Sequence, residues 1–483
     1  MADLPTPERL RTLIATLEHG LLQRGTAVRL ALLAALAGEH VLLLGPPGTA
    51  KSALARRLHT AFDGTRYFER LLTRFSTPEE LFGPLSLKAL EEDRYERLTD
   101  GFLPTAGVAF LDEVFKANSA ILNALLTLLN ERAFDNGSGR ERTPLVSVVG
   151  ASNEGPADEA LQAFFDRFLL RVPVQPVDDE AFDALLRLPD APEPAPAAPI
   201  TPLEREALRA AAAGVRLSDE VLAACRALRD WLAAQDQAVS DRRWRQWMQL
   251  MRVAAATEGR AEVDLLDLWL APFVAGANPA QGEALAEWFQ AGQLQAVALE
   301  APWLTRAVEA FEAQLQIEQS ARDEAETDGA AGKLALARAI GLGGSGGSGS
   351  TGEASGEPGM LRIVSAALEA QLQRRYSPVH IAARLVQLDE VLAQAGSERA
   401  SVAARAQALA EAAAQRLWLP PELAARWQAA HGHTLAVLDG LLARLAAVRT
   451  GFAALPEDPQ AQALAPAPVM LPAAAAEPTS TAA

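Results

Sequence analysis

Cysteine, positive charge and long hydrophobic runs are all scarce in this sequence of 483 residues. Cys225 is the only cysteine, which excludes an internal disulfide framework and any multi-cysteine metal site and fits a reducing compartment. The most apolar segment, residues 30–44, is interrupted by Glu39 and His40 and is shorter than the roughly 20 residues that a membrane-spanning helix needs. We therefore expect no membrane span.

The charge balance is acidic, with 44 Lys and Arg against 61 Asp and Glu and a net charge of −17. Nucleic-acid affinity depends largely on Lys and Arg that neutralise phosphates, so we expect no nucleic-acid partner and favour protein partners. The first ten residues, MADLPTPERL, have no basic region followed by an apolar stretch. We therefore expect no secretory signal peptide and a cytoplasmic protein.

Three short apolar runs, at residues 41–44, 108–111 and 145–150, alternate with helical patterns. Such runs predict a parallel sheet with helices on both faces, that is, an α/β core over residues 1–188. Beyond this core the pattern is helical almost everywhere, which predicts an all-α lid and an all-α C-terminal module. The expected divisions are a Pro/Ala-rich linker (189–202), the lid (203–276), the first part of the helical module (277–340), a flexible Gly/Ser segment, either natural or engineered (341–359), the second part of the module (360–454) and a disordered tail (455–483).

The run at 41–44 leads into GPPGTAKS and then a helical pattern, which is the context of a phosphate-binding loop. Backbone N–H groups at such a helix start can converge on nucleotide phosphates. Lys51 would reach the β and γ phosphates, and the Ser52 hydroxyl would coordinate Mg²⁺. Ala50 stands where glycine is usual and is tolerated if the backbone there is already helical. The expected nucleotide-binding residues are Gly45, Pro46, Pro47, Gly48, Thr49, Ala50, Lys51 and Ser52.

Polar residues also follow the other two apolar runs. VAFLDE places Asp112 and Glu113 at the end of a predicted strand, where Asp112 would hold Mg²⁺ and Glu113 would polarise the attacking water. Asn153, after the next run, can reach the same site and hydrogen-bond the water or the γ-phosphate. The alternatives are a helix cap for the two acids and an ordinary turn for the asparagine.

These motifs resemble a known family. GPPGTAKS, FLDE, ASNE and the DRF at 166–168 resemble, in order and spacing, the Walker A, Walker B, sensor 1 and arginine-finger elements of AAA+ ATPases. ASNE and FLDEVFKANSAILNALLTLLNERAF are most similar to the MoxR branch, and SDRRW at 240–244 is similar to its RavA subfamily. Unlike RavA-type proteins, the chain has no strand-like alternation after residue 340, so we expect no inserted β domain.

The resemblance assigns roles to two arginines. It implies that Arg167 reaches the nucleotide of a neighbouring subunit in a ring, expected to be a hexamer, and an ion pair with a local acid such as Asp166 is the alternative. It also implies that Arg242 contacts the nucleotide of its own subunit as sensor 2, with Arg243 as the competing choice. Adjacent arginines cannot share one helix face, so we expect only one to do so.

Two further segments fit a motor. Residues 79–103 resemble the hairpin inserted into helix 2 of MoxR proteins, which faces the ring channel, and residues 134–144 predict a tight hairpin or a solvated loop. We expect an ATP- and Mg²⁺-dependent motor that remodels or matures a protein client, with a VWA-domain partner of the ViaA kind implied by the resemblance. The alternatives are a nucleotide-dependent adaptor and a chelatase-like subunit for metal insertion.

Overall fold

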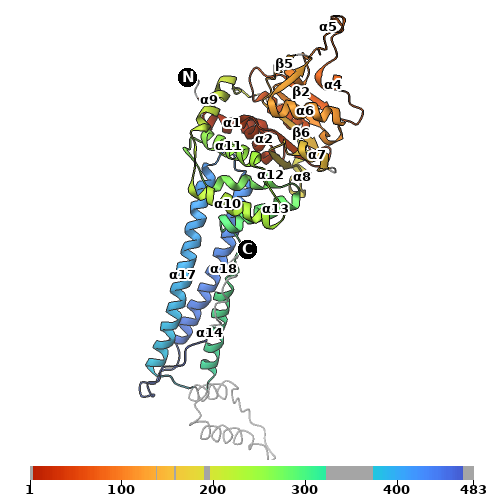
Figure 1. The fold of residues 1–483 in the computed structure, drawn as a ribbon. Helices are drawn as coiled ribbons and strands as arrows, with labels where there is room; N and C mark the ends of the chain where they lie inside the picture. Colours follow the sequence, from red (N-terminus) through yellow and green to blue (C-terminus); the bar gives the residue numbers. More distant parts are fainter. Residues whose placement is uncertain (1–3, 138, 157–158, 190–195, 322–373, 471–483) are drawn as a thin grey trace, which may run out of the picture. The chain divides into compact units, whose positions relative to one another are not determined.

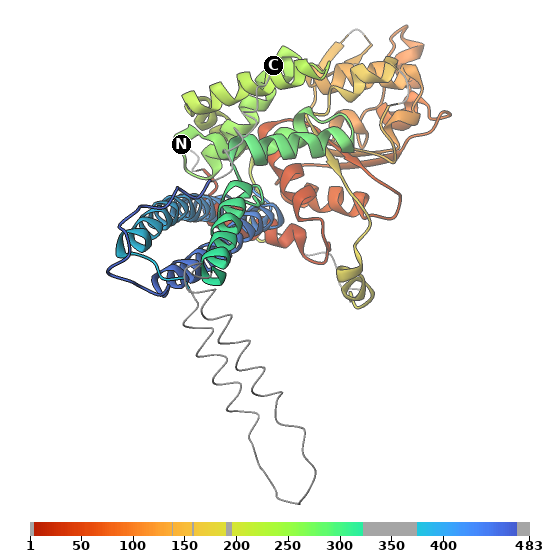
Figure 2. The same ribbon diagram turned by 90° about the horizontal axis from the view of Figure 1, so that it is seen from below.

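The computed structural model describes residues 4–137, 139–156, 159–189, 196–321 and 374–470 (Figures 1 and 2). The described residues form two compact units. Unit 1 holds the residues up to 296 together with 409–427, and unit 2 holds the remainder. The Gly/Ser segment expected to be flexible, 341–359, lies outside the described residues.

The core of unit 1 is a parallel five-stranded sheet in the order β2-β3-β6-β1-β7. This confirms the expected α/β class. The three apolar runs noted in the sequence form β1, β3 and β6. The sequence did not predict β2 and β7. The strands are β1 (Val41–Leu44), β2 (Tyr67–Leu71), β3 (Val108–Asp112), β6 (Ser147–Ser152) and β7 (Leu170–Pro173).

Both faces of the sheet are covered by apolar helices. Val41 and Leu43 contribute to one buried cluster with α1, α2 and α3, whereas Leu42 contributes to a second cluster with α4, α6 and α7. Alternate residues of a strand face opposite sides, so a strand buried on both sides is apolar along its whole length. These helices are α1 (Pro7–Glu18), α2 (Gly25–Ala37), α3 (Lys51–Thr60), α4 (Pro78–Phe82), α6 (Ser119–Glu131) and α7 (Glu159–Phe165), and α8 (Asp179–Leu186) follows the last strand.

Two insertions accompany the sheet. The strands β4 (Ala133–Asn136) and β5 (Gly139–Arg142) pair antiparallel, so of the two alternatives for this segment the structure has the hairpin and not the solvated loop. The other insertion carries the short helix α5 (Leu87–Glu91) between Leu85 and Arg97, which form an antiparallel bridge. The Asn136 side chain ties the two insertions together, because its amide accepts from the Arg97 N–H at 2.7 Å and donates to the Arg97 carbonyl at 3.2 Å.

The lid belongs to unit 1 and extends beyond the expected boundary at 276, since the unit runs to residue 296. The described end of the expected linker, residues 196–202, packs within unit 1 and does not separate two units. Ile200 forms a bridge with Phe62, and Arg9 donates to the carbonyl of Pro199 at 2.7 Å. The lid elements are α9 (Pro202–Ala213), α10 (Asp219–Ala234), α11 (Asp241–Thr257), η3 (Leu265–Leu270), α12 (Ala271–Ala275), α13 (Pro279–Trp288), and two strands missed by the helical reading, β8 (Arg216–Leu217) and β9 (Glu262–Val263).

The described part of unit 2 is built on three helices, α14 (Pro302–Ser320), α17 (Pro378–Gln415, whose end lies in unit 1) and α18 (Pro421–Ala453, whose start lies in unit 1). The predicted disordered tail is wrong for residues 455–470, which pack within this unit. Tyr376 forms a bridge with Glu457, and the Arg384 side chain donates to the carbonyl of Ala467 at 2.8 Å. The Ala/Pro-rich composition concealed Leu455, whose side chain is buried in the core of unit 2.

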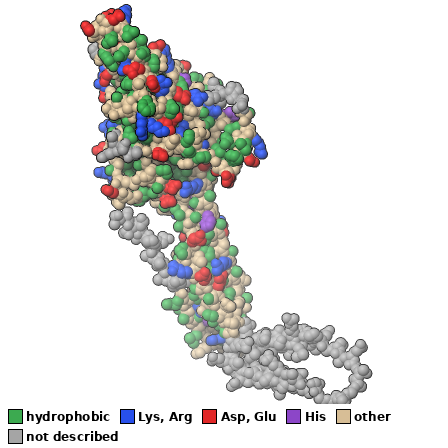
Figure 3. Space-filling model, turned by 90° about the vertical axis from the view of Figure 1, so that its right-hand side faces the viewer, with side chains coloured by type: hydrophobic (Ala, Val, Ile, Leu, Met, Phe, Trp, Pro, Cys, Tyr) green, Lys and Arg blue, Asp and Glu red, His purple; other side chains and the backbone are tan. Residues whose placement is uncertain are grey.

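No helix among the described residues is long and apolar enough to cross a bilayer. Figure 3 shows hydrophobic and charged side chains interspersed over the visible face of these residues. The largest exposed hydrophobic side chains include several in the insertion that carries α5. They are Leu87, Leu90, Tyr95 and Leu98.

Candidate active site

The phosphate-binding loop connects β1 to α3 through a backbone that needs special residues. Gly45 lies so close to β7 that an added Cβ would fall 1.9 Å from the carbonyl oxygen of Val174. Gly48 has a φ of 80°, and Ala50, at the start of α3, has a φ of 63°. The condition under which alanine was expected to be tolerated, a helical backbone at this position, is therefore not met. The left-handed conformation costs a non-glycine residue about 1–2 kcal/mol, and here the loop imposes it on alanine.

A cleft of about 310 Å³ lies at the carboxyl-terminal edge of the sheet. Parallel strands end together there, so residues that follow different strands meet at one place. The structure brings the three predicted motifs together, although Gly45 and Pro46 do not line the cleft. The lining residues are Pro47, Gly48, Thr49, Ala50, Lys51, Ser52, Asp112, Glu113 and Asn153.

Lys51 is held inside the loop. Its Nζ donates to the carbonyls of Gly45 at 2.6 Å and Pro46 at 2.8 Å. Burial lowers the pKa of Lys51, and the carboxylates of Asp112 and Glu113 partly oppose this shift. The two hydrogen bonds fix the direction of the Lys51 side chain, and its ammonium group carries a positive charge that can bind a phosphate.

The two carboxylates of β3 have different surroundings. Asp112 accepts a hydrogen bond from the backbone N–H of Glu113 at 2.9 Å. Glu113, with a φ of 52°, accepts from the Asn153 amide at 2.9 Å on one oxygen and lies 3.2 Å from Lys116 Nζ through the other. Asn153 therefore positions Glu113 directly, in addition to its predicted role of hydrogen-bonding the water or the γ-phosphate.

Sequence reasoning missed two residues at this site. The buried Arg24 donates through Nε to the carbonyl of Thr49 at 3.1 Å and so supports the phosphate-binding loop from α2. Nothing in the sequence marks Arg24, because it stands at the start of an ordinary apolar helix. Lys116 could have been found from its spacing, since it follows Glu113 by three residues in a helical turn.

Arg167 lies at the opposite, amino-terminal edge of the sheet, three residues before β7. The four residues of β1 alone span about 13 Å, which exceeds the reach of an arginine side chain. Arg167 is not in an ion pair with Asp166, whose carboxylate instead lies 3.1 Å from Arg243 and 3.9 Å from Arg171. Among the described residues, Arg167 Nε is buried with no hydrogen-bond partner. Partial burial and the nearby charge of Arg242 lower the pKa of Arg167.

Arg242 also lies away from the cleft, so its expected contact with the nucleotide of its own subunit is not supported. Its side chain donates to Asn130 Oδ1 at 2.8 Å. Burial raises the pKa of Glu39, a residue that lies just before β1, and the positive charge of Arg242 acts against this rise. The reason is topological, because α11 begins beside the amino-terminal edge of the sheet. The structure therefore gathers Arg167 and Arg242 at one edge and the phosphate-binding loop at the other.

Two family models match the chain. Residues 8–209 match the model described as the MoxR domain in the MoxR-vWA-beta-propeller ternary systems, and residues 220–289 match an AAA lid domain. The chain belongs to the MoxR family of AAA+ ATPases. The matched residues cover the sheet, the cleft and the lid, while the likeness of SDRRW to the RavA subfamily stays a prediction.

Three relatives each match part of the chain. Two uncharacterised proteins of Methanocaldococcus jannaschii are each 41% identical, over 249 and 254 residues, or 51% of this chain in both cases. The matches span 64% and 66% of those two proteins, so less than two thirds of either is covered. Protein MoxR of Paracoccus denitrificans is 30% identical over 173 residues, which is 34% of this chain and 50% of that protein.

Proposed function

We propose that this MoxR-family protein hydrolyses ATP at an interface between subunits of a ring, expected to be a hexamer. The observation that carries the proposal is the position of Arg167 at the sheet edge opposite the cleft, where its Nε has no partner among the residues that the structure describes. An arginine there cannot serve its own cleft, but it can serve a neighbour in a head-to-tail assembly. Such heterologous contacts form a ring when the rotation between successive subunits closes.

The residues of the cleft fit ATP and Mg²⁺. The N–H groups at the start of α3 and the charge of Lys51 would bind the phosphates. Ser52 and Asp112 supply hard oxygen ligands for Mg²⁺, which would neutralise charge on the phosphates when bound. Glu113, held by Asn153, would take a proton from the attacking water.

Arg167 would complete the cleft of the next subunit. A guanidinium has a planar set of donors that matches the oxygens of a phosphoryl group in transfer, and such an arginine contributes about 10³–10⁵-fold to turnover in enzymes that use one. Arg242 lies beside Arg167, so it would add positive charge at the same interface. This gives Arg242 a role between subunits, in place of the expected role within one.

The work done by the ring is proposed to be the remodelling or maturation of a protein client in the cytoplasm. The matching family description names systems that join a MoxR domain to a vWA protein, which supports a VWA-domain partner. A nucleotide-dependent adaptor with incidental turnover is the alternative. Turnover that a partner stimulates would favour the motor, whereas unstimulated slow turnover would favour the adaptor.

The first test is ATP turnover by wild type, Glu113→Gln and Arg167→Ala, with the particle mass measured with and without nucleotide. We expect both variants to bind ATP, to form nucleotide-stabilised rings and to lose at least about 10²-fold in turnover. The matched control is Arg187→Ala, which removes an exposed arginine that forms an ion pair with Asp183 and should keep full turnover. Unchanged turnover of Arg167→Ala would contradict the proposal.

A further inference from the structure

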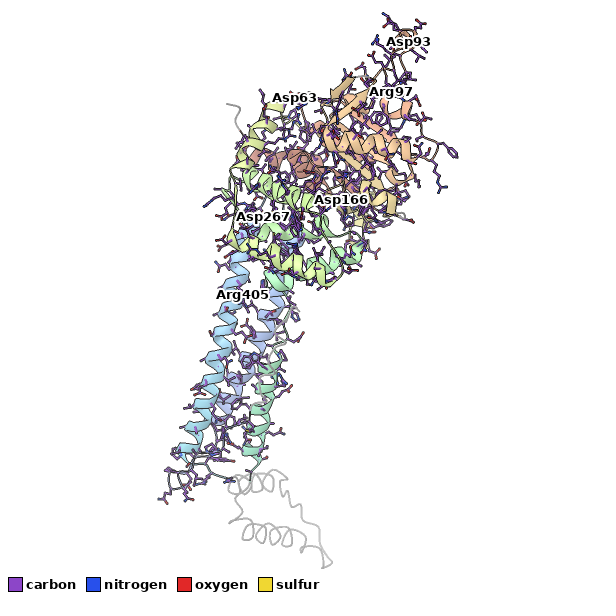
Figure 4. All side chains as sticks on the ribbon, viewed as in Figure 1. Asp63, Asp93, Arg97, Asp166, Asp267 and Arg405 are labelled. Atoms are coloured by element: carbon purple, nitrogen blue, oxygen red, sulfur yellow. The ribbon has the colours of Figure 1, made fainter. Side chains whose placement is uncertain are left out.

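Arg243 is the neighbour of Arg242 on α11, but its surroundings are different. Its side chain is only 3% exposed. All five of its N–H donors have acceptors. Nε donates to the carbonyl of Val274 at 2.7 Å, Nη1 to the carbonyl and the carboxylate of Asp166 at 3.2 and 3.1 Å, and Nη2 to the carbonyls of Phe168 and Leu169 at 3.0 and 2.7 Å. Figure 4 labels Asp166, which lies beside the lid helices.

These acceptors surround Arg167 in the sequence. The carbonyls of Asp166 and Phe168 come directly before and after it, so Arg243 fixes the backbone on both sides of Arg167. The remaining acceptors are the carbonyl of Leu169, in the same turn, and the carbonyl of Val274, which belongs to α12 of the lid. A single buried guanidinium therefore joins the turn between α7 and β7 to two lid helices.

The neighbouring Arg171 strengthens the same turn. Its guanidinium lies 3.8 Å from the centre of the Phe165 ring and within 3.9 Å of the Asp166 carboxylate. Phe165 ends α7 and Asp166 follows it, so the residues before Arg167 are held by two cations. Arg167 itself has no partner for Nε among the described residues, so its direction depends on the backbone that carries it.

We propose that Arg243 is the positioning residue for Arg167 and that it transmits the position of the lid to the neighbouring subunit's active site. The inference rests on the proposed function of Arg167 between subunits. Burying a guanidinium carries a large desolvation cost, and a hydrophobic residue of similar size often gives equal stability. An arginine with five directed hydrogen bonds provides orientation, and a displacement of about 1 Å at a reacting group can cost 10²-fold in rate.

The test is a double-mutant cycle on ATP turnover by the full-length protein. Arg243→Gln should lower kcat by roughly 10–100-fold and leave the KM for ATP within about twofold, because its own cleft is intact. The double variant Arg167→Ala/Arg243→Gln should be no slower than Arg167→Ala alone, since Arg243 acts only through Arg167. Arg245→Gln, which removes an exposed arginine of the same helix, is the matched control and should match wild type.

If the Arg243→Gln variant does not fold, Arg243→Lys takes its place in the double-mutant cycle with Arg167→Ala. A lysine keeps the charge but cannot reach five acceptors, so a smaller loss in kcat is expected. Losses in kcat that multiply in the double variant, or a loss of ATP binding, would overturn the positioning role. If Arg167→Ala keeps full turnover, the proposed function of Arg167 fails first, and the two failures are thereby distinguished.

Discussion

Glu39 shows at the residue scale how a carboxyl can be retained at a nearly buried position. It precedes β1, and its side chain accepts a hydrogen bond from the Gln246 amide at 2.7 Å. Burial raises the pKa of Glu39 to about 7, although Arg132 and Arg242 act in the opposite direction. Its carboxyl therefore binds a proton in the folded protein at a pH where the unfolded chain has released it.

The sign of the resulting pH dependence follows from that raised pKa. Between the unfolded value of 4.5 and about 7, the folded state binds more protons than the unfolded state, so this residue makes stability fall as pH rises. We expect wild type to lose on the order of 1–3 kcal/mol from Glu39 between pH 4.5 and 7.5, relative to Glu39→Gln. Urea unfolding of both proteins across this range measures the difference, and parallel stability curves would contradict it.

Residues of the cleft could be predicted better than those at the opposite sheet edge. The glycines, Lys51, Asp112 and Glu113 are recognisable because the chemistry needs those residue types next to a strand. The partners of Arg242 and Arg243 could not be predicted, because two adjacent arginines have the same local sequence and differ only in tertiary contacts. Burial decides between them, since Arg243 points into the protein and Arg242 is exposed.

At the scale of elements, the strands that were predicted are those buried on both faces. β2 was not predicted because its sequence, YFERL, contains charged residues. The strand lies at an edge of the sheet, where Glu69 is exposed and Arg70 is partly buried. β7 escaped because Arg171 interrupts its apolar run, and the stacking of Arg171 on Phe165 explains how a strand accommodates that charge. Both are tertiary effects that a local pattern does not contain.

The connection between α17 and α18 is an element whose role the sequence did not reveal. Residues 409–427 belong to unit 1, far along the chain from the rest of that unit. Trp418 is 1% exposed, and its indole N–H donates to Thr257 Oγ1 at the end of α11. Arg416 forms an ion pair with Glu258 at 3.3 Å. This connection therefore completes the core of the lid.

Trp418→Ala is expected to destabilise unit 1 by about 3–5 kcal/mol, because it leaves a cavity in a closely packed core. Trp418→Phe keeps most of the volume and loses mainly the hydrogen bond to Thr257, so a cost of about 1–2 kcal/mol is expected. Chemical unfolding followed by near-ultraviolet circular dichroism measures both. Equal and small losses would show that the connection contributes little to unit 1.

At the scale of the whole molecule, the fold separates the two halves of the proposed catalytic machinery. The cleft occupies one edge of the sheet in unit 1, and Arg167 occupies the other edge. The two family models match residues 8–209 and 220–289, which belong to unit 1. The unit that holds the cleft and Arg167 is therefore also the unit that resembles the family. The number of compact units could not be predicted from composition, because the segment 189–202 has the Pro/Ala-rich composition of a linker and yet its described residues 196–202 belong to unit 1.

A mixture of two inactive variants tests the central claim most directly. Glu113→Gln keeps an intact Arg167, and Arg167→Ala keeps an intact cleft, so co-assembly should restore turnover where an intact cleft meets an intact arginine. Random pairing in equal amounts predicts about a quarter of wild-type turnover from such rings. Turnover no higher than that of either variant alone, in rings shown by mass to contain both subunits, would contradict catalysis across a subunit interface.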